Sequence, residues 1–265
     1  MKIAVIPNLN NNGVRELTEE TVKKLQTLGA VVCDSIEEAE IVIALGGDGT
    51  TLKVAKEASL LGKPTLGINA GRLGFMSGLE KDELDLLEKV VKGEFITETR
   101  MMLKAKLIDG EKCLGEYHAL NDAVISRGDF ARLMDIHLSS EGRAITDIRA
   151  DGVIISTPTG STAYSMAAGG PVVAPDNFCF IVTPICPHSL VNRSIVFSSD
   201  KELEVTAMND RNNNVFLSFD GADSIKLNQN TKIVISKSEY SVKLIKLKPD
   251  NFYEILNNKI LERRE

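Results

Sequence analysis

Short apolar runs alternate with helix-period segments over the first hundred residues, and this alternation limits the fold more than any other feature of the sequence. Four apolar runs predict strands, at 3–6, 30–33, 41–45 and 65–68. The run Ile-Val-Ile-Ala-Leu at 41–45 is apolar at every position, as expected for a strand that is covered on both faces. Segments with helical spacing separate the strands, at 14–28, 50–61 and 82–91. The pattern is typical of βαβ units around a parallel sheet.

The pattern changes after about Gly93. Turn residues there separate short runs that look like strands, at 103–108, 123–126, 134–138 and 153–156. The same pattern of short apolar runs and turn residues returns from 195 to 246, and polar and apolar residues alternate at 232–236 and 242–246. We therefore predict a second, all-β region at about 100–246. A helix should follow Pro249, because Phe252, Leu256 and Ile260 are four residues apart.

Composition and charge exclude several classes of protein. With 43% hydrophobic and 26% charged residues, the 265-residue chain has the composition of a soluble globular protein. No apolar stretch approaches the ~18 residues of a membrane-spanning helix, and the first residues lack a signal peptide, so we expect a cytoplasmic protein with no membrane partner. A net charge of −6 argues against a nucleic-acid partner. The four cysteines and three histidines are too scattered for a metal site, so we expect any metal to arrive with a ligand.

The first candidate site is the run Gly-Gly-Asp-Gly-Thr at 46–50, which follows the most apolar strand and precedes a helix. Ligands of open α/β sheets bind at the carboxyl ends of strands, and a helix N-terminus attracts anions. An aspartate disfavours simple phosphate binding, so Asp48 needs a task such as accepting a proton from a hydroxyl or holding Mg²⁺. Lys53 would supply a positive charge nearby. The alternative is a glycine-rich turn in which Asp48 only caps the helix.

Three further segments have side chains suited to a nucleotide. Asn69–Phe75 follows the next strand, and Phe75 is able either to stack on a base or to pack in the core. The run 156–165 contains many hydroxyls, which suit a sugar or phosphate but also cap helices, and a helical stretch is expected at 162–168. Asn121 and Asp122 suit ribose hydroxyls, although an exposed turn is the commoner explanation of such a pair.

Familiar nucleotide and hydrolase motifs are absent. Leu52 stands where the third glycine of Gly-x-Gly-x-x-Gly belongs, which disfavours a hydride-transferring dehydrogenase. The sequence also lacks a Walker-type loop and the Gly-x-Ser-x-Gly elbow of serine hydrolases.

Taken together, these segments resemble the bacterial NAD kinases, which phosphorylate the 2′-hydroxyl of the adenosine ribose of NAD to make NADP. The resemblance rests on six motifs in the family's order, at 46–50, 69–75, 121–122, 151–165, 183–188 and 219–221. It implies a Rossmann-like parallel α/β domain at 1–98 plus 249–265, a β-sandwich-like domain at 99–248, and a terminal helix that returns to the first domain. It also implies NAD and ATP as substrates, Mg²⁺ or another divalent cation bound with ATP, and a homodimer or homotetramer in which one subunit completes the other's dinucleotide site.

The resemblance also assigns roles to individual residues. Asp48 would be the general base that takes the proton from the 2′-hydroxyl. NAD or ATP would be bound by Gly47, Gly49, Thr50, Lys53, Asn69, Phe75, Asn121, Asp122, Arg149, Asp151, Ser156, Thr159, Thr162, Ala163, Tyr164, Ser165, Ala167 and Asp220. Two departures affect fine positioning: Ala150 stands where many members have glycine, and Asp122 where glutamate is frequent. Neither departure removes a reacting group.

Two other functions compete with this interpretation. Diacylglycerol and sphingoid kinases share the Gly-Gly-Asp-Gly run, but a lipid kinase needs a basic or apolar surface toward the membrane and has no evident use for the run 157–164. A non-catalytic NADP sensor would be expected to lack Asp48, which is present.

Overall fold

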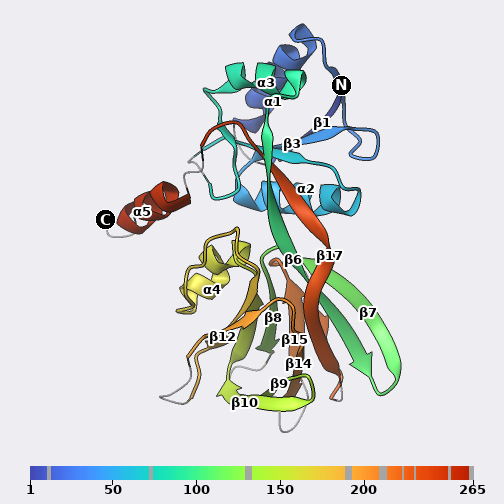
Figure 1. Ribbon diagram of the computed structural model, residues 1–265, viewed down its shortest axis with the longest axis vertical. Coiled ribbons are helices and arrows are strands. Elements are labelled where there is room, and N and C mark those ends of the chain that lie inside the picture. Colours follow the sequence, from blue (N-terminus) through green and yellow to red (C-terminus); the bar gives the residue numbers. More distant parts are fainter. Residues whose placement is uncertain are drawn as a thin grey trace. The chain divides into compact units, whose positions relative to one another are not determined.

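The computed structural model describes residues 1–10, 13–71, 74–128, 133–188, 193–208, 214–222, 224–229, 231–249 and 252–262. Contacts divide the chain into two units, one comprising Met1–Arg100 and Tyr240–Glu265 and the other Met101–Glu239 (Figure 1). The boundaries fall inside two long strands, β6 (Ile96–Asp109) and β17 (Lys232–Lys246). The C-terminal helix α5 (Phe252–Glu262) therefore belongs with the N-terminal hundred residues, which is the grouping that the family resemblance implies.

A parallel sheet forms the centre of the first unit. Its strands are β1 (Lys2–Pro7), β2 (Val31–Cys33), β3 (Ile41–Gly46) and β4 (Thr65–Asn69), with β5 (Leu79–Glu80) and the end of β17 beside β4. All these pairs are parallel. In the order β2-β1-β3-β4, the chain places β2 on one side of β1 and then β3 and β4 on the other side, so the winding of the sheet reverses between β1 and β3. Ligands of such sheets bind outside the carboxyl ends of the strands at the reversal. The predicted parallel sheet is confirmed, and its strand order makes the loops that follow β1 and β3 the expected ligand-binding edge.

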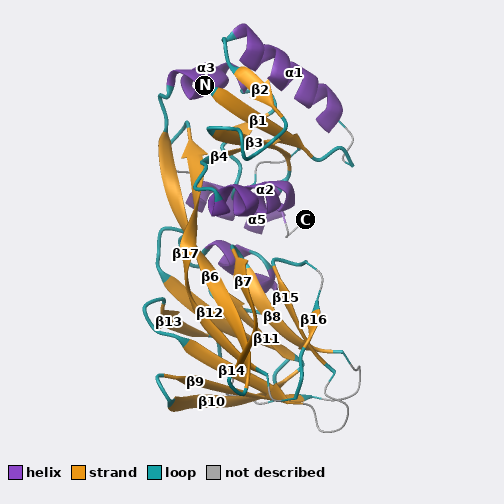
Figure 2. Ribbon diagram, turned by 90° about the vertical axis from the view of Figure 1, so that its right-hand side faces the viewer, coloured by secondary structure: helices purple, strands orange, loops and turns teal. Residues whose placement is uncertain are grey.

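Helices cover both faces of this sheet (Figure 2). One face packs against α1 (Val14–Thr27) and α3 (Leu87–Lys92), which bury large aliphatic side chains on it. The other face packs against α2 (Asp48–Leu60) through small side chains, Val54 and Ala58 on Ala4 and Ala44. Because alanines bring the helix axis close to the strands, the start of α2 is tightly fixed relative to the end of β3.

The bounds of two helices differ from the predicted ones. α2 begins at Asp48 rather than Thr50, because Gly47 is extended and takes the N-cap position. The helix predicted at 82–91 is a 3₁₀ turn, η1 (Leu84–Leu86), followed by the short α3. A turn precedes η1, in which the Glu80 N–H donates to the Glu83 carboxylate.

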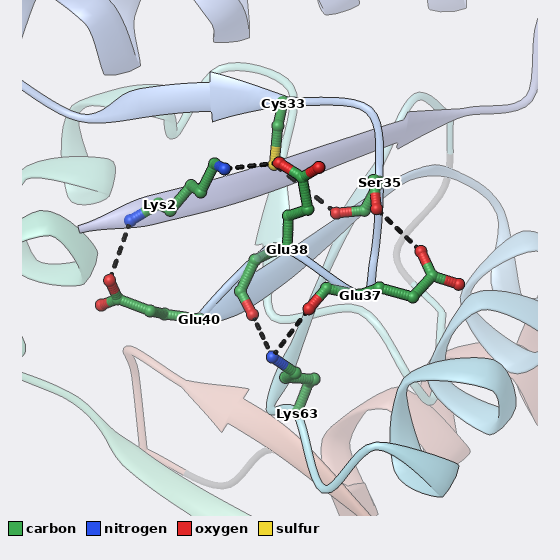
Figure 3. A network of polar contacts seen from close by, with 8 residues as sticks. Lys2, Cys33, Ser35, Glu37, Glu38, Glu40 and Lys63 are labelled. Carbon is green, nitrogen blue, oxygen red and sulfur yellow. Dashed lines mark hydrogen bonds and ion pairs between the residues drawn. The ribbon is translucent and has the colours of Figure 1, made fainter.

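The connection from β2 to β3 has no helix, and polar contacts hold it instead (Figure 3). Lys63 Nζ donates to the carbonyl oxygens of Glu37 and Ala39 at 3.3 and 2.5 Å. Lys2 Nζ pairs with the Glu38 carboxylate at 2.5 Å, which raises the pKa of Lys2.

Two antiparallel sheets build the second unit. One contains β7 (Lys112–Ala119), β9 (Met134–Ser140), β10 (Arg143–Ala150) and β14 (Leu203–Met208), together with parts of β6 and β17. The other has the order β13-β12-β11-β8-β15-β16, with bounds Ile195–Ser198, Cys179–Ile185, Gly152–Ser156, Asp122–Arg127, Val215–Phe219 and Ile225–Lys226. Side chains from both sheets form one hydrophobic core, in which Phe180 is fully buried. The unit is a β-sandwich, so the predicted fold class is confirmed.

Two further segments differ from the sequence prediction. The predicted strands 232–236 and 242–246 are one continuous strand, β17, because the residues between them stay extended. The hydroxyl-rich run forms a 3₁₀ turn, η2 (Thr159–Thr162), and a single helical turn, α4 (Tyr164–Ala167), instead of the helical stretch expected at 162–168. None of the described helices is both long and apolar enough to cross a membrane.

Candidate active site

The loop between β3 and α2 lies at the reversal of the parallel sheet. Gly46 ends β3, and a Cβ there would lie 2.5 Å from Thr50 Oγ1, so this position needs glycine. Asn8, which follows β1, donates its backbone N–H to the Leu45 carbonyl at 2.9 Å and its side-chain amide to Thr50 Oγ1 at 3.1 Å. The loops after the two central strands are thus joined, and Asn8 is a residue of this loop pair that the sequence analysis missed.

The Asp48 carboxylate accepts hydrogen bonds from a segment that follows the neighbouring strand. Oδ2 accepts the Phe75 N–H at 3.1 Å, and Oδ1 accepts the Met76 N–H at 3.2 Å. α2 itself has no side-chain cap hydrogen bond. The interpretation of Asp48 as a simple helix cap therefore finds no support, because these donors belong to another part of the chain.

Other predicted residues of the first unit surround this loop. Gly49 and Lys53 are exposed, whereas Gly47 and Thr50 are half-buried. Asn69 is buried and its side-chain oxygen accepts the Gly71 N–H at 3.0 Å. Residues 72 and 73 of the predicted segment lie outside the described residues. The half-buried Phe75 has its ring 5.9 Å from the ring of Phe252 in α5, so it makes a packing contact.

In the second unit, Asn121 and Asp122 form a turn at the start of β8 that is held from two sides. The Asp220 carboxylate accepts the N–H groups of Leu120, Asn121 and Asp122 at 3.1, 2.7 and 3.3 Å. On the other side, Thr157 donates its hydroxyl to the Leu120 carbonyl at 2.5 Å and its N–H to the Asn121 carbonyl at 2.8 Å. Asp220 thus orients the turn, and Thr157 is a second supporting residue that the sequence analysis did not single out.

Gly160 packs against this turn so closely that a side chain does not fit. A Cβ at position 160 would overlap the backbone carbonyl of Asn121. We expect Gly160→Ala to lower the free energy of unfolding by about 1–3 kcal/mol, as overpacked sites do. Chemical denaturation of the variant and the wild type measures this difference. Equal denaturation midpoints would show that the turn accommodates the methyl group with no loss of stability.

The hydroxyls of the run 156–165 bond mostly within the protein. Ser156 donates to the Thr157 carbonyl at 2.7 Å, and Ser165 shares a hydrogen bond of 3.0 Å with Thr183. The Thr159 hydroxyl is buried and has no hydrogen-bond partner among the described residues. The more accessible predicted residues are Thr162, Ala163, Tyr164 and Ala167, with Tyr164 and Ala167 exposed.

Arg149 and Asp151 lie at the end of β10 and the start of β11, and each has an ion-pair partner. The Asp151 carboxylate pairs with Arg127 Nε at 2.8 Å, and Arg149 Nε lies 3.7 Å from the Asp135 carboxylate. The Arg149 side chain is 62% exposed.

The carboxyl of Asp122 is the most perturbed group of the predicted site. The residue is only 4% exposed, and the described part of the chain provides no hydrogen-bond partner for its carboxyl. Burial, together with the nearby negative charge of Asp220, raises the pKa of Asp122 to about 7. A carboxyl of this kind is suited to accept hydroxyl groups of a ligand, since it lacks partners of its own.

The described residues add neither a metal centre nor a pocket to the predicted site. No group of three or more His, Cys, Asp or Glu side chains in them has the arrangement of a metal site. A hollow of about 510 Å³ lies between the end of α2 and the connection from β2 to β3, and none of the predicted site residues lines it. Its lining is Ile6, Asp34, Ile36, Glu37, Glu57, Leu60 and Leu61.

Comparisons with known proteins agree with these motifs. The family model described as the ATP-NAD kinase N-terminal domain matches residues 7–95, and that of the ATP-NAD kinase C-terminal domain matches residues 120–247. The chain is 38% identical to an NAD kinase of Thermoanaerobacter sp. (strain X514) and 39% identical to one of Caldanaerobacter subterraneus, in both cases over 99% of each chain.

Solved structures share the fold over nearly the whole chain. A yeast NADH kinase in complex with NADH superposes with a TM-score of 0.86 at 24% identity, covering 99% of this chain and 87% of that one. An NAD kinase from Archaeoglobus fulgidus in complex with ATP superposes with a TM-score of 0.78 at 27% identity, covering 98% of both chains. Motifs, fold and relatives agree, and the chain belongs to the NAD kinase family of phosphotransferases.

Proposed function

We propose that the protein transfers the γ-phosphoryl group of Mg²⁺-bound ATP to the 2′-hydroxyl of the adenosine ribose of NAD. The 2′-oxygen forms a bond to the γ-phosphorus, the bond from that phosphorus to the β–γ bridging oxygen breaks, and ADP leaves. Asp48 takes the proton of the 2′-hydroxyl, so NADP and ADP are the products. Mg²⁺ enters as part of the ATP substrate, where it offsets the charge of the triphosphate.

The contacts of Asp48 are the observation that carries this proposal. Its carboxylate lies at the reversal of the parallel sheet and accepts two backbone N–H groups, at 3.1 and 3.2 Å. An oriented carboxylate at a ligand-binding edge suits a base that abstracts a proton. The N-terminus of α2 favours the phosphates, with Gly47, Gly49, Thr50 and Lys53 as their contacts.

The remaining predicted residues are assigned to NAD. Asn121 and Asp122 would bind ribose hydroxyls, while Thr162, Ala163, Tyr164 and Ala167 would line the adenine and ribose. In the second unit, the buried residues Ser156, Thr159 and Ser165 and the half-buried Asp220 would hold these contacts in place. In the first unit, Asn69 and Phe75 would contribute to NAD binding. Arg149 and Asp151 would reach the ligand of a neighbouring subunit in a cytoplasmic homodimer or homotetramer.

One assay separates this proposal from its alternatives. Purified protein is incubated with NAD, ATP and Mg²⁺, and NADP is detected with an NADP-specific dehydrogenase. We expect NADP to form only when all three are present. A folded protein that binds NADP without forming it would support the sensor, and phosphorylation of a diacylglycerol or sphingoid base without NADP would support the lipid kinase.

A further inference from the structure

The backbone of Gly74–Met76 lies directly against the Asp48 carboxylate. The Phe75 and Met76 N–H groups donate to its two oxygens, and a Cβ at Gly74 would overlap the carboxylate. This contact follows from the sheet, because Asp48 follows β3 and Gly74 follows the paired strand β4, with Gly46 beside Asn69. Only glycine at position 74 lets two consecutive N–H groups approach both carboxylate oxygens.

An aromatic contact supports the other side of the same segment. The Phe75 ring lies 5.9 Å from the Phe252 ring, which is 7% exposed at the start of α5. Met76, the second donor, is itself 5% exposed. The segment therefore has Asp48 on one side and a buried residue of the C-terminal helix on the other. Phe252 follows Asp48 by 204 positions in the chain, so no local pattern connects them.

We propose that Gly74 and Phe252 are positioning residues for the phosphoryl transfer. They hold the Phe75 and Met76 N–H groups in place, and these N–H groups fix the direction in which the Asp48 carboxylate points. Neither residue needs to touch a substrate. Loss of these two donors changes the direction in which the carboxylate points, and misplacing a reacting group by about 1 Å costs on the order of 10²-fold in rate. This inference rests on the proposed role of Asp48.

The first test is Gly74→Ala, with Gly71→Ala as its control. Among the described residues, a Cβ at Gly71 would meet nothing closer than Asn69 Oδ1 at 3.9 Å, so the control adds the same methyl group to the same segment without overlap with them. We expect Gly74→Ala to lower kcat about 10–100-fold with the KM for NAD changed less than about threefold, and Gly71→Ala to change neither by more than about twofold. An unchanged kcat, or a change confined to KM, overturns the inference.

Hydrogen exchange gives a second readout that does not depend on turnover. The amides of Phe75 and Met76 should exchange faster in Gly74→Ala than in the wild type or in Gly71→Ala, because they lose their acceptor. Faster exchange with normal kcat means that the contact exists but does not position the base. Failure of the proposed function gives a different result. In that case Asp48→Asn keeps normal turnover, while the Phe75 and Met76 amides of Gly74→Ala still exchange faster.

Two further variants test the contact between the Phe75 and Phe252 rings, and they can be used even if Gly74→Ala does not fold. Phe252→Ala should lower kcat and speed exchange of the Phe75 amide, whereas Phe252→Leu, which keeps an apolar contact, should recover most of both. Glu254→Ala on the exposed side of the same helix is the control. If Phe252→Ala matches Glu254→Ala in kcat and in exchange, α5 plays no part in positioning Asp48.

Discussion

Asp48→Asn is expected to form NADP about 10²–10⁴-fold more slowly than the wild type, the usual contribution of a general base. An amide at this position has nearly the same shape but cannot take a proton from the 2′-hydroxyl. The KM for NAD should change little, because Asp48 acts on the reacting proton. Initial rates of NADP formation at saturating ATP measure both parameters.

The substitution has a structural effect that must be separated from the chemical one. An asparagine oxygen accepts one of the two N–H groups, whereas its own NH₂ faces the other, so one hydrogen bond is lost. This loss costs about 1–3 kcal/mol of folding free energy and should appear as a lower melting temperature. Asp34→Asn is the matched control, since Asp34 is an exposed carboxylate directly after β2 of the same sheet. If Asp48→Asn turns over within about fivefold of that control, Asp48 is not the base.

Local sequence pattern predicts the elements of this protein well where burial is uniform. β3 is apolar at every position and is buried at every position. The exposed strand β10 is different: its sequence Arg-Ala-Ile-Thr-Asp-Ile-Arg-Ala mixes charges with isoleucines, and Ile145 is 36% exposed. Its position beside β9 depends on pairing with a partner strand, which no local period reveals.

The candidate site shows the same division between local pattern and long-range contact. The sequence identifies Asp48 and Asp122 from the residues next to them. It does not reveal that backbone N–H groups 27 and 28 positions away bind Asp48, or that Asp220 binds N–H groups about 100 positions earlier. Backbone donors are present at nearly every residue, so their use leaves no mark on the sequence. Asp220 is identified by resemblance alone, and its contacts give the physical reason for its place beside Asn121.

Asp122 should make the unliganded protein less stable as the pH rises from about 4 to about 7. Its pKa is raised from 3.8 to about 7 in the folded chain, by burial first and by the charge of Asp220 second. Between these values the unfolded chain releases the proton while the folded chain keeps it, so the free energy of unfolding falls with pH and levels off above about 7. The full effect is on the order of 4 kcal/mol, from about three pH units at 1.36 kcal/mol each.

Asp122→Asn removes this titration while keeping the size of the side chain. The variant should match the wild type in thermal stability near pH 4 and exceed it near pH 8 by several kcal/mol, a shift on the order of 10 °C. Asp176→Asn, at an exposed carboxylate of the same unit, should show no such divergence. An Asp122→Asn advantage that is equal at both pH values would contradict the titration.

The same carboxyl then links stability to substrate binding. The ionised form accepts hydrogen bonds more strongly and offers both oxygens to the hydroxyls of a ribose, and the folded protein ionises Asp122 at about pH 7. The KM of the wild type for NAD should therefore fall as the pH rises from 6 to 8, while that of Asp122→Asn should be higher and independent of pH over this range. A bound ribose supplies the hydrogen bonds that the buried carboxylate lacks, so saturating NAD should reduce the stability difference between the two proteins at pH 8. If NAD leaves that difference unchanged, Asp122 is a structural residue and does not contact the ribose.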